Sequence, residues 1–193
     1  MQDLLQYMIL LPENEIPIME SYINNCIDKL TNDIAMESIG STVSGKLSLI
    51  GNRIKKAFNK IKSSTKNKNS EDIREANREL MDSINELDNA SKEAKTPDDK
   101  KKIKIAVGAI LASVIYLLII LKLHKPAAKL KQSMNNDNIT PKDTKNIVSI
   151  VDLYIEKYLK DQQFNQSEYI KKNKDSIELS DNLINAIDRF NKK

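Results

Sequence analysis

The sequence predicts an all-α protein of about six or seven helices, one of them strongly hydrophobic. With only 4 glycines and 5 prolines among 193 residues, long stretches contain no helix breaker. Apolar side chains recur at intervals of three and four residues, which is the period of an amphipathic helix. Charged residues make up 30% of the chain and aromatic residues 5%, a composition that favours solvated helix faces over β-sheet.

The N-terminal region, residues 1–69, is expected to begin with two helices. Residues 1–11 are largely apolar and predict a short packing helix that ends at Pro12. No lysine or arginine precedes these apolar residues, so we expect no cleavable signal. Pro17 is expected to open a second helix, whose apolar stripe comprises Ile18, Ile23, Cys26, Ile27, Leu30 and Ile34. Gly40, Gly45 and Gly51 lie close together and predict a turn or hinge.

A basic amphipathic helix is expected from Val43 to Lys62, followed by a polar linker that ends at residue 69. No acidic residue occurs between Glu37 and Glu71. We predict that the cations bind an anionic surface of lipid headgroups; they are Lys46, Arg53, Lys55, Lys56, Lys60 and Lys62. One open alternative is pairing with the acidic helix that follows, in the same or a neighbouring chain. Nucleic acid is less favoured, because Phe58 alone offers a ring for stacking.

Residues 70–95 reverse the charge and predict an acidic amphipathic helix. Ser70 is a good N-cap, and two carboxylates follow it in the first turn, where they favour the helix dipole. Ile73, Leu80 and Leu87 recur every seven residues. This spacing predicts a seam that packs against another helix.

An uncharged, apolar run extends from Ile105 to Leu121, inside a predicted hydrophobic helical region at 96–126. Thr96 and Pro97 supply a cap and a first residue, and Pro126 is expected to end or kink the helix. A helix of the run's length covers about 25 Å, close to the ~30 Å of a bilayer core. We predict a candidate membrane span that includes Ile105, Gly108, Ala112, Ile115, Tyr116 and Leu121.

The same run has an alternative interpretation. A helix that is apolar on every side can also be the central helix of a soluble bundle or lie in an oligomeric interface. Gly108 and Ala112 stand four apart, a spacing that lets two membrane helices approach closely, but a simple fit against neighbouring helices explains it better. Lysines flank the run and are more numerous before it, so a spanning helix would place the N-terminal part in the cytoplasm.

Residues 127–193 predict a C-terminal helical region. Thr140 and Pro141 follow a polar loop and repeat the cap-and-proline start. The helix after them has an apolar stripe made of Ile147, Ile150, Val151, Tyr154, Ile155, Tyr158 and Leu159. Two shorter helical pieces are expected near 167–170 and 179–190.

The sequence offers little chemistry. Residues 40–47 nearly match the phosphate-binding pattern G-x-x-x-x-G-K-[ST], but Leu47 replaces the hydroxyl residue and no strand precedes them. Cys26 lies on an apolar stripe, which indicates a core position rather than a nucleophile. His124 is the only histidine, and its place near a helix end suits the helix dipole. One histidine and one cysteine cannot build the usual zinc sites, so we predict no enzyme, metal or cofactor.

These patterns favour a non-enzymatic, membrane-associated structural or assembly protein. We expect one pass through the membrane, a basic helix on the anionic leaflet, and protein partners bound through helical faces, as a homo-oligomer or a larger assembly. The alternative is a soluble all-helical virion or scaffold subunit whose apolar helix is buried in the oligomer. Lysine, asparagine and isoleucine are abundant, which indicates an AT-rich genome and fits a phage or viral component.

Overall fold

The computed structural model describes residues 12–31, 42–67, 70–121, 123–134 and 139–164. These residues form six α-helices and no strand, which confirms the predicted all-α class. The helices are α2 (Pro12–Thr31), α3 (Thr42–Asn67), α4 (Ser70–Glu93), α5 (Pro97–Ile120), α6 (His124–Met134) and α7 (Pro141–Phe164). The helices predicted at 1–11, 167–170 and 179–190 lie outside the described residues.

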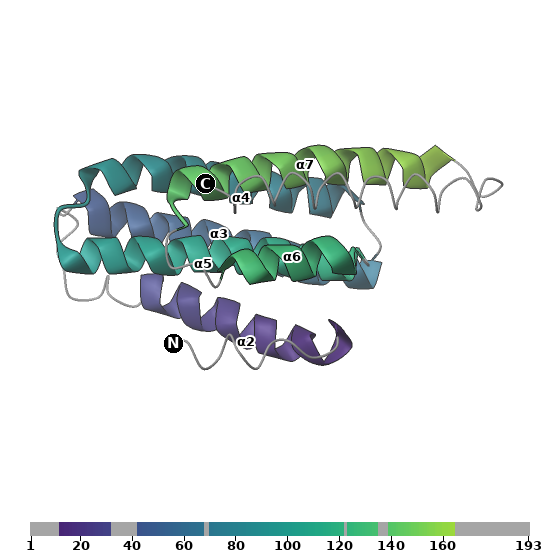
Figure 1. Ribbon diagram of the computed structural model, residues 1–193, viewed down its shortest axis with the longest axis horizontal. Coiled ribbons are helices and arrows are strands. Elements are labelled where there is room, and N and C mark those ends of the chain that lie inside the picture. The colour runs from purple at the N-terminus through teal and green to yellow at the C-terminus, as the bar shows by residue number, and fades with distance from the viewer. Residues whose placement is uncertain (1–11, 32–41, 68–69, 122, 135–138, 165–193) are drawn as a thin grey trace.

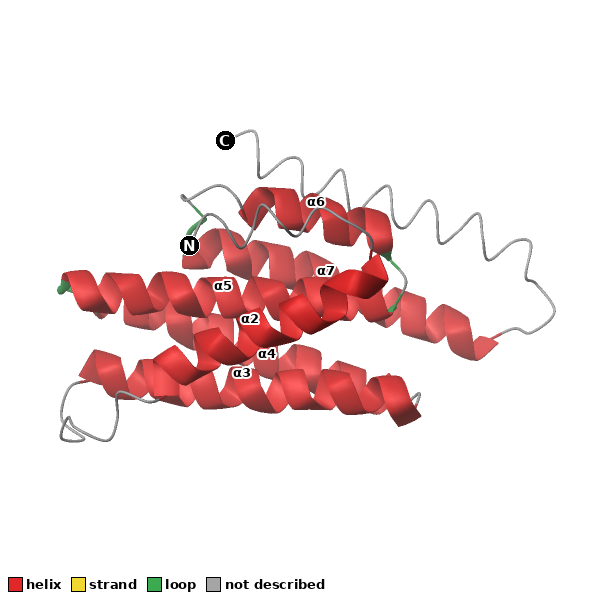
Figure 2. Ribbon diagram, turned by 90° about the horizontal axis from the view of Figure 1, so that it is seen from below, coloured by secondary structure: helices red, strands yellow, loops and turns green. Residues whose placement is uncertain are grey.

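The helices are elongated along a common axis and gather around α5. Figure 1 places α4 and α7 on one side of the bundle and α2 on the opposite side, and Figure 2 shows the same bundle from below. Helix α5 contacts α2, α3, α4, α6 and α7. It is therefore the central helix, while the other helices turn one apolar stripe inward and a charged face outward.

The predicted helix starts at Thr96 and Thr140 are present. The hydroxyl of Thr96 accepts a hydrogen bond from the backbone N–H of Asp99, whose carboxylate accepts one from the Thr96 N–H. Thr140 and Asp143 make the same reciprocal pair at the start of α7. Such capping boxes satisfy N–H groups that a helix leaves open at its N-terminus, so a local sequence pattern is enough to specify them.

Two predictions about helix breakers are wrong. Helix α2 begins at Pro12, and Pro17 lies inside it on an exposed face, where water can satisfy the carbonyl left without a partner. Gly45 and Gly51 lie inside α3 instead of forming a hinge, and Gly40 lies outside the described residues. Helix α3 also continues to Asn67, so residues 63–67 are helical and not part of a linker. A Cβ atom at Gly51 would stand 2.9 Å from the Cβ of Leu30. Gly51 thus allows α2 and α3 to approach closely, and packing explains this glycine better than a turn.

The end of the hydrophobic helix also differs from its prediction. Helix α5 ends at Ile120, where the N–H of Leu121 caps the carbonyl groups of Leu117 and Ile119. Pro126 does not end this helix. It lies in the first turn of α6, where a residue without an N–H group costs no hydrogen bond.

The heptad seam of α4 is buried as predicted. Ile73, Leu80 and Leu87 are at most 8% exposed, and Ala76 and Ile84 between them are fully buried. Helix α4 contacts α3, α5 and α7 through its apolar face. Helices from all four predicted regions thus share one hydrophobic core.

Candidate functional site

The bundle encloses the candidate membrane span almost completely. Four of its predicted residues are buried, namely Ile105, Ala112, Ile115 and Tyr116, while Gly108 and Leu121 are half-buried. Among the described helices, α5 alone is long and apolar enough to cross a membrane, and 78% of its most apolar window is buried inside the protein. The length fits a bilayer, and the burial fits the central helix of a bundle.

Helix α2 packs closely against α5 at Gly108. A Cβ atom at this position would stand 2.7 Å from the hydroxyl oxygen of Tyr22. The small residue therefore fits a neighbouring helix of the same chain, as the simpler interpretation of its spacing predicted. Ser113 on α5 is fully buried and donates its hydroxyl proton to the carbonyl oxygen of Ala109, 2.8 Å away, so its polar group is satisfied within the helix.

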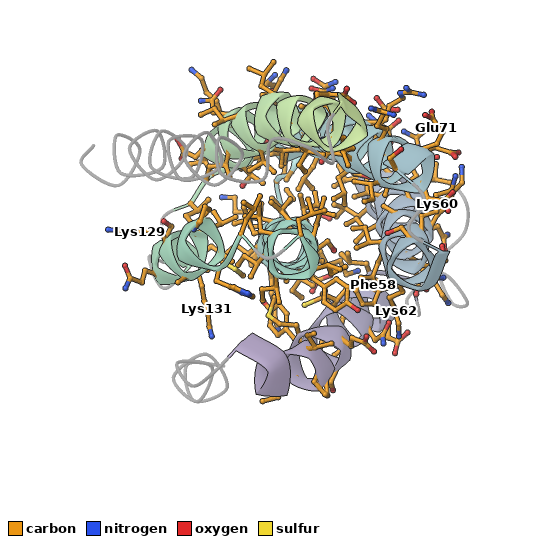
Figure 3. All side chains as sticks on the ribbon, turned by 90° about the vertical axis from the view of Figure 1, so that its right-hand side faces the viewer. Phe58, Lys60, Lys62, Glu71, Lys129 and Lys131 are labelled. Carbon is orange, nitrogen blue, oxygen red and sulfur yellow. The ribbon has the colours of Figure 1, made fainter. Side chains whose placement is uncertain are left out.

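A polar cluster, which we call the Glu20 latch, joins α2 to α3 and α5. Glu20 on α2 accepts a hydrogen bond from the hydroxyl of Tyr116 at 2.8 Å on Oε1, and one from Nζ of Lys62 at 2.7 Å on Oε2. The ring of Phe58 lies edge-on to that of Tyr116, with 5.2 Å between centroids, and Lys62 Nζ stands 5.7 Å from the Phe58 centroid. Figure 3 shows Phe58 and Lys62 beside α2.

Sequence reasoning missed Glu20, although one signal pointed to it. Tyr116 carries the only phenolic hydroxyl in the apolar run, and a buried hydroxyl needs a hydrogen-bond partner. Periodicity could not name that partner, because Glu20 is 96 residues away in the chain.

The basic face of α3 meets the acidic face of α4 in an antiparallel series of ion pairs, which we call the charge ladder. Its four rungs are Lys46–Glu93, Arg53–Glu86, Lys56–Glu79 and Lys60–Glu75. The Nζ–Oε1 distance is 2.6 Å in the first rung and the Nη1–Oε1 distance is 2.9 Å in the second. The hydrogen bond from Lys60 holds the pKa of Glu75 below its usual range, and the hydrogen bond to Glu79 raises the pKa of Lys56.

Five of the six cations predicted to bind an anionic surface therefore have carboxylate partners in the protein. Four belong to the charge ladder, and Lys62 pairs with Glu20. Among the described residues, Lys55 is exposed and makes no ion pair. It lines a shallow depression on the outer face of α3, together with Asn52, Lys56, Asn59, Lys60 and Ser63. Attraction to an anionic surface stays a prediction, and the carboxylates beside these cations weaken it.

The remaining candidate groups from the sequence are the cysteine, the near phosphate-binding pattern and the histidine, and each lies on a helix of the bundle. Cys26 is 6% exposed, and burial raises the pKa of its thiol, which disfavours the nucleophilic thiolate. Residues 42–47 of the near phosphate-binding pattern form the start of α3, so the lysine at 46 follows no loop there. His124 is exposed at the start of α6 rather than at a C-terminus. No group of three potential metal ligands occurs within the described residues.

No protein-family model matches this chain, and no curated protein or solved structure matches it either. The function proposed below therefore depends on the physical properties of the bundle alone.

Proposed function

We propose that the protein is a non-enzymatic, all-helical structural or assembly subunit that carries its apolar helix as the core of its own bundle. The observation behind the proposal is the position of α5, which is covered by five other helices of the same chain. A helix without a polar face needs apolar neighbours on every side, and this arrangement provides them without a bilayer and without a second chain.

The polar atoms around α5 support the same conclusion. The hydroxyl groups of Ser113 and Tyr116 find acceptors inside the bundle, at Ala109 and Glu20. In a bilayer core, Glu20 would be a costly partner, because a carboxylate is expensive to place among lipid tails. The contact between Tyr116 and Glu20 therefore suits a helix that rests inside protein. In this proposal, exposed side chains outside the charge ladder, such as Lys55 and Leu153, contact other chains of an assembly, such as a scaffold or virion.

Fractionation tests this proposal. The full-length chain, expressed without detergent, should remain in the supernatant after ultracentrifugation and give a helical spectrum with one cooperative melting transition. Ile115→Arg should abolish that transition, because it places a charge at a fully buried position. Leu153→Arg is the matched control, since Leu153 is 71% exposed. Wild-type protein that stays in the membrane pellet after alkaline carbonate and dissolves only in detergent would refute the proposal.

A second candidate function is a single-pass membrane protein with its N-terminal part in the cytoplasm. The lysines at the N-terminal end of α5 favour it, because Lys100, Lys101 and Lys104 are exposed there, as the flanks of a span require. In this case, protease added to intact cells should cut beyond Pro126 and spare the chain before Thr96. Equal protection of both sides in cells, together with a soluble purified protein, would exclude this function.

A further inference from the structure

Helices α3 and α4 form an outer face of the bundle that carries two parallel stripes of opposite charge. The basic stripe belongs to α3 and the acidic stripe to α4, and the rungs of the charge ladder join them along the face. Figure 3 shows the two helices side by side at one edge of the bundle, with Lys60 and Glu71 on the outer side. The apolar sides of both helices face the shared core, so the charged sides are turned to the solvent.

Side chains recur along both helices of this face at the spacing of a helix seam. Steps of three and four residues separate the outer residues of α3, which are Leu49, Asn52, Lys56, Asn59 and Ser63. The same steps separate the outer residues of α4, which are Glu75, Arg78, Asp82, Asn85 and Asn89. Residues at this spacing lie on one side of a helix, where another helix can pack along them. Leu49 is 61% exposed, which leaves a large apolar side chain of this face in water.

The α3 side of the face is also hollowed. Asn52, Lys56, Asn59 and Ser63 line the shallow depression described above, together with Lys55 and Lys60. Ammonium and amide groups are hydrogen-bond donors, and they bind carboxylates strongly when the donor is charged. An acidic side chain of another helix therefore finds donors in this depression.

A second copy of the chain offers a matching surface. Two copies that meet face to face through a two-fold rotation can have the axis across the helices or along them. An axis across the helices places each basic stripe on the basic stripe of the other copy, where like charges repel. An axis along the helices places α3 of each copy on α4 of the other, so each basic stripe meets an acidic one. Charge complementarity therefore selects the axis along the helices.

The charge ladder then fixes which residues meet, because this rotation keeps every residue at its own level along the bundle. Asp82 is exposed and lies on α4 between Glu79 and Glu86. The ladder partners of these two glutamates on α3 are Lys56 and Arg53. The Lys56 side chain is the most exposed cation of the ladder, at 56%, and its ammonium group has three donors, of which Glu79 takes one. Asp82 of one copy therefore stands within reach of Lys56 of the other.

The face is large enough for a specific dimer. The 24 residues of α4 cover about 36 Å at ~1.5 Å per residue, and α3 has 26 residues. Two packed helices side by side are about 20 Å wide. Each copy therefore buries about 700 Å², and the total of about 1,400 Å² lies within the ~1,200–2,000 Å² of specific interfaces.

We propose that the protein forms a two-fold homodimer through the outer faces of α3 and α4, with Lys56 of each copy paired to Asp82 of the other. This inference rests on the proposed function, because it names a partner of the assembly subunit, namely a second copy of the same chain. The contacts are polar and charged, so the dimer is reversible and weakens as salt screens the charges.

Reversal of one charge tests the pairing in the full-length chain. Sedimentation velocity over a range of protein concentrations measures the equilibrium between monomer and dimer. Asp82→Lys should weaken dimerisation at least tenfold, because it places like charges together at two symmetric points. In about 1 M salt, where the Debye length is about 3 Å, the wild-type dimer should dissociate as well. Asp28→Lys is the matched control, since it makes the same change at an exposed position of α2 and should leave the equilibrium unchanged.

A mixture of two variants tests whether the pair forms between copies. Lys56→Glu together with Glu79→Lys reverses one rung and keeps an ion pair within the chain, and this variant should also dimerise at least tenfold more weakly. An equal mixture with Asp82→Lys should recover most of the wild-type dimer, because both contacts between positions 56 and 82 again join opposite charges. Circular dichroism checks that each variant melts as the wild-type protein does.

The possible results distinguish this inference from the proposed function. Wild-type protein that is monomeric at every concentration, or a dimer that Asp82→Lys leaves intact, would overturn the inference while the soluble bundle stands. Two weakened variants that do not recover when mixed would overturn it as well. A wild-type chain that dissolves only in detergent would refute the proposed function, and the inference would fail with it.

Discussion

The two ways in which helices attach to α3 differ in kind. Helix α4 follows α3 after two residues and is aligned with it by four ion pairs spread along the interface. Helix α2 precedes α3 by a ten-residue connection and is attached by apolar contacts and, among the described side chains, by the carboxylate of Glu20. Exposed ion pairs contribute about 0–1 kcal/mol each to stability. The charge ladder therefore contributes more to the alignment of α4 along α3 than to the free energy of folding. The comparison shows that the α3–α4 pair is redundantly specified, whereas the docking of α2 depends on a few positions.

The largest effect is expected at Phe58, which packs beside the Glu20 latch. Its ring is 1% exposed and packs against Tyr116. Phe58→Ala should lower the free energy of unfolding by about 3–5 kcal/mol, because it leaves a cavity and removes an aromatic pair. Urea denaturation followed by circular dichroism measures the loss. Leu153→Ala should change stability by less than about 0.5 kcal/mol, and an equal loss in both variants would contradict this assignment of the core.

The next effect tests the docking of α2 directly, with Cys26 as a native probe. Hydrogen bonds to a charged group contribute about 1.5–3 kcal/mol, and 1.4 kcal/mol corresponds to a factor of ten. Glu20→Ala should therefore accelerate the reaction of the buried Cys26 thiol with a soluble disulfide reagent by about tenfold or more. Glu86→Ala should leave the rate unchanged. Acceleration by both substitutions would mean that Cys26 reports general loosening instead of movement of α2.

Two glycines of α3 provide a sharper comparison within one helix. Gly51→Ala should destabilise the protein by about 1–3 kcal/mol, because the new methyl group meets the Cβ of Leu30 at 2.9 Å. Gly45→Ala should stabilise it by about 0.5–1 kcal/mol, since the new methyl group has nothing within 4 Å and alanine favours the helix. Thermal melting of both variants shows whether each substitution lowers or raises the melting temperature. Stabilisation by Gly51→Ala would contradict the close approach of α2 and α3.

A smaller effect is expected from any one rung of the charge ladder. Arg53 and Glu86 have side chains that are 40% and 42% exposed, so a double-mutant cycle on this pair should give a coupling of about 0.2–1 kcal/mol. Lys56→Glu should destabilise the α3–α4 pair, and the additional substitution Glu79→Lys should restore most of the loss. A charge-reversed protein that is fully stable without this compensation would show that the ladder plays no part in pairing.

The smallest effect concerns pH. The pKa of Glu75 is lowered by Lys60, so its contribution to stability is present above the unfolded pKa, about 4.3 for glutamate, and is lost as pH falls through the folded value. The stability difference between wild-type protein and Glu75→Gln should therefore shrink from pH 7 to pH 3. A stability difference that grows as the pH falls would contradict the lowered pKa assigned to Glu75. The pKa of Lys56 is raised, so this group affects stability at alkaline pH. Its contribution to stability is lost as the pH rises through the folded pKa.

Several features of the fold could be predicted because neighbouring residues decide them. The capping boxes at Thr96 and Thr140 use residues only three positions apart. The stripes of α3 and α4 and the apolar run of α5 follow from helical periodicity, which fixes the direction of each side chain once the helix exists. Gly51 and Pro126 were misinterpreted because a local rule for helix breakers ignores the partner helix and the start of the following helix.

The candidate site shows where the sequence alone is insufficient. The sequence by itself established that the protein is all-α, that Ile105 to Leu121 needs an apolar environment, and that α3 and α4 carry opposite charges. Only the tertiary structure showed that five helices of the same chain contact α5, that the charges pair as an antiparallel ladder, and that Tyr116 finds Glu20 on α2. The physical reason is the range of the interactions. Periodicity and capping act within a turn or two of one helix, whereas the partner of a buried face or hydroxyl depends on which distant helix packs against it.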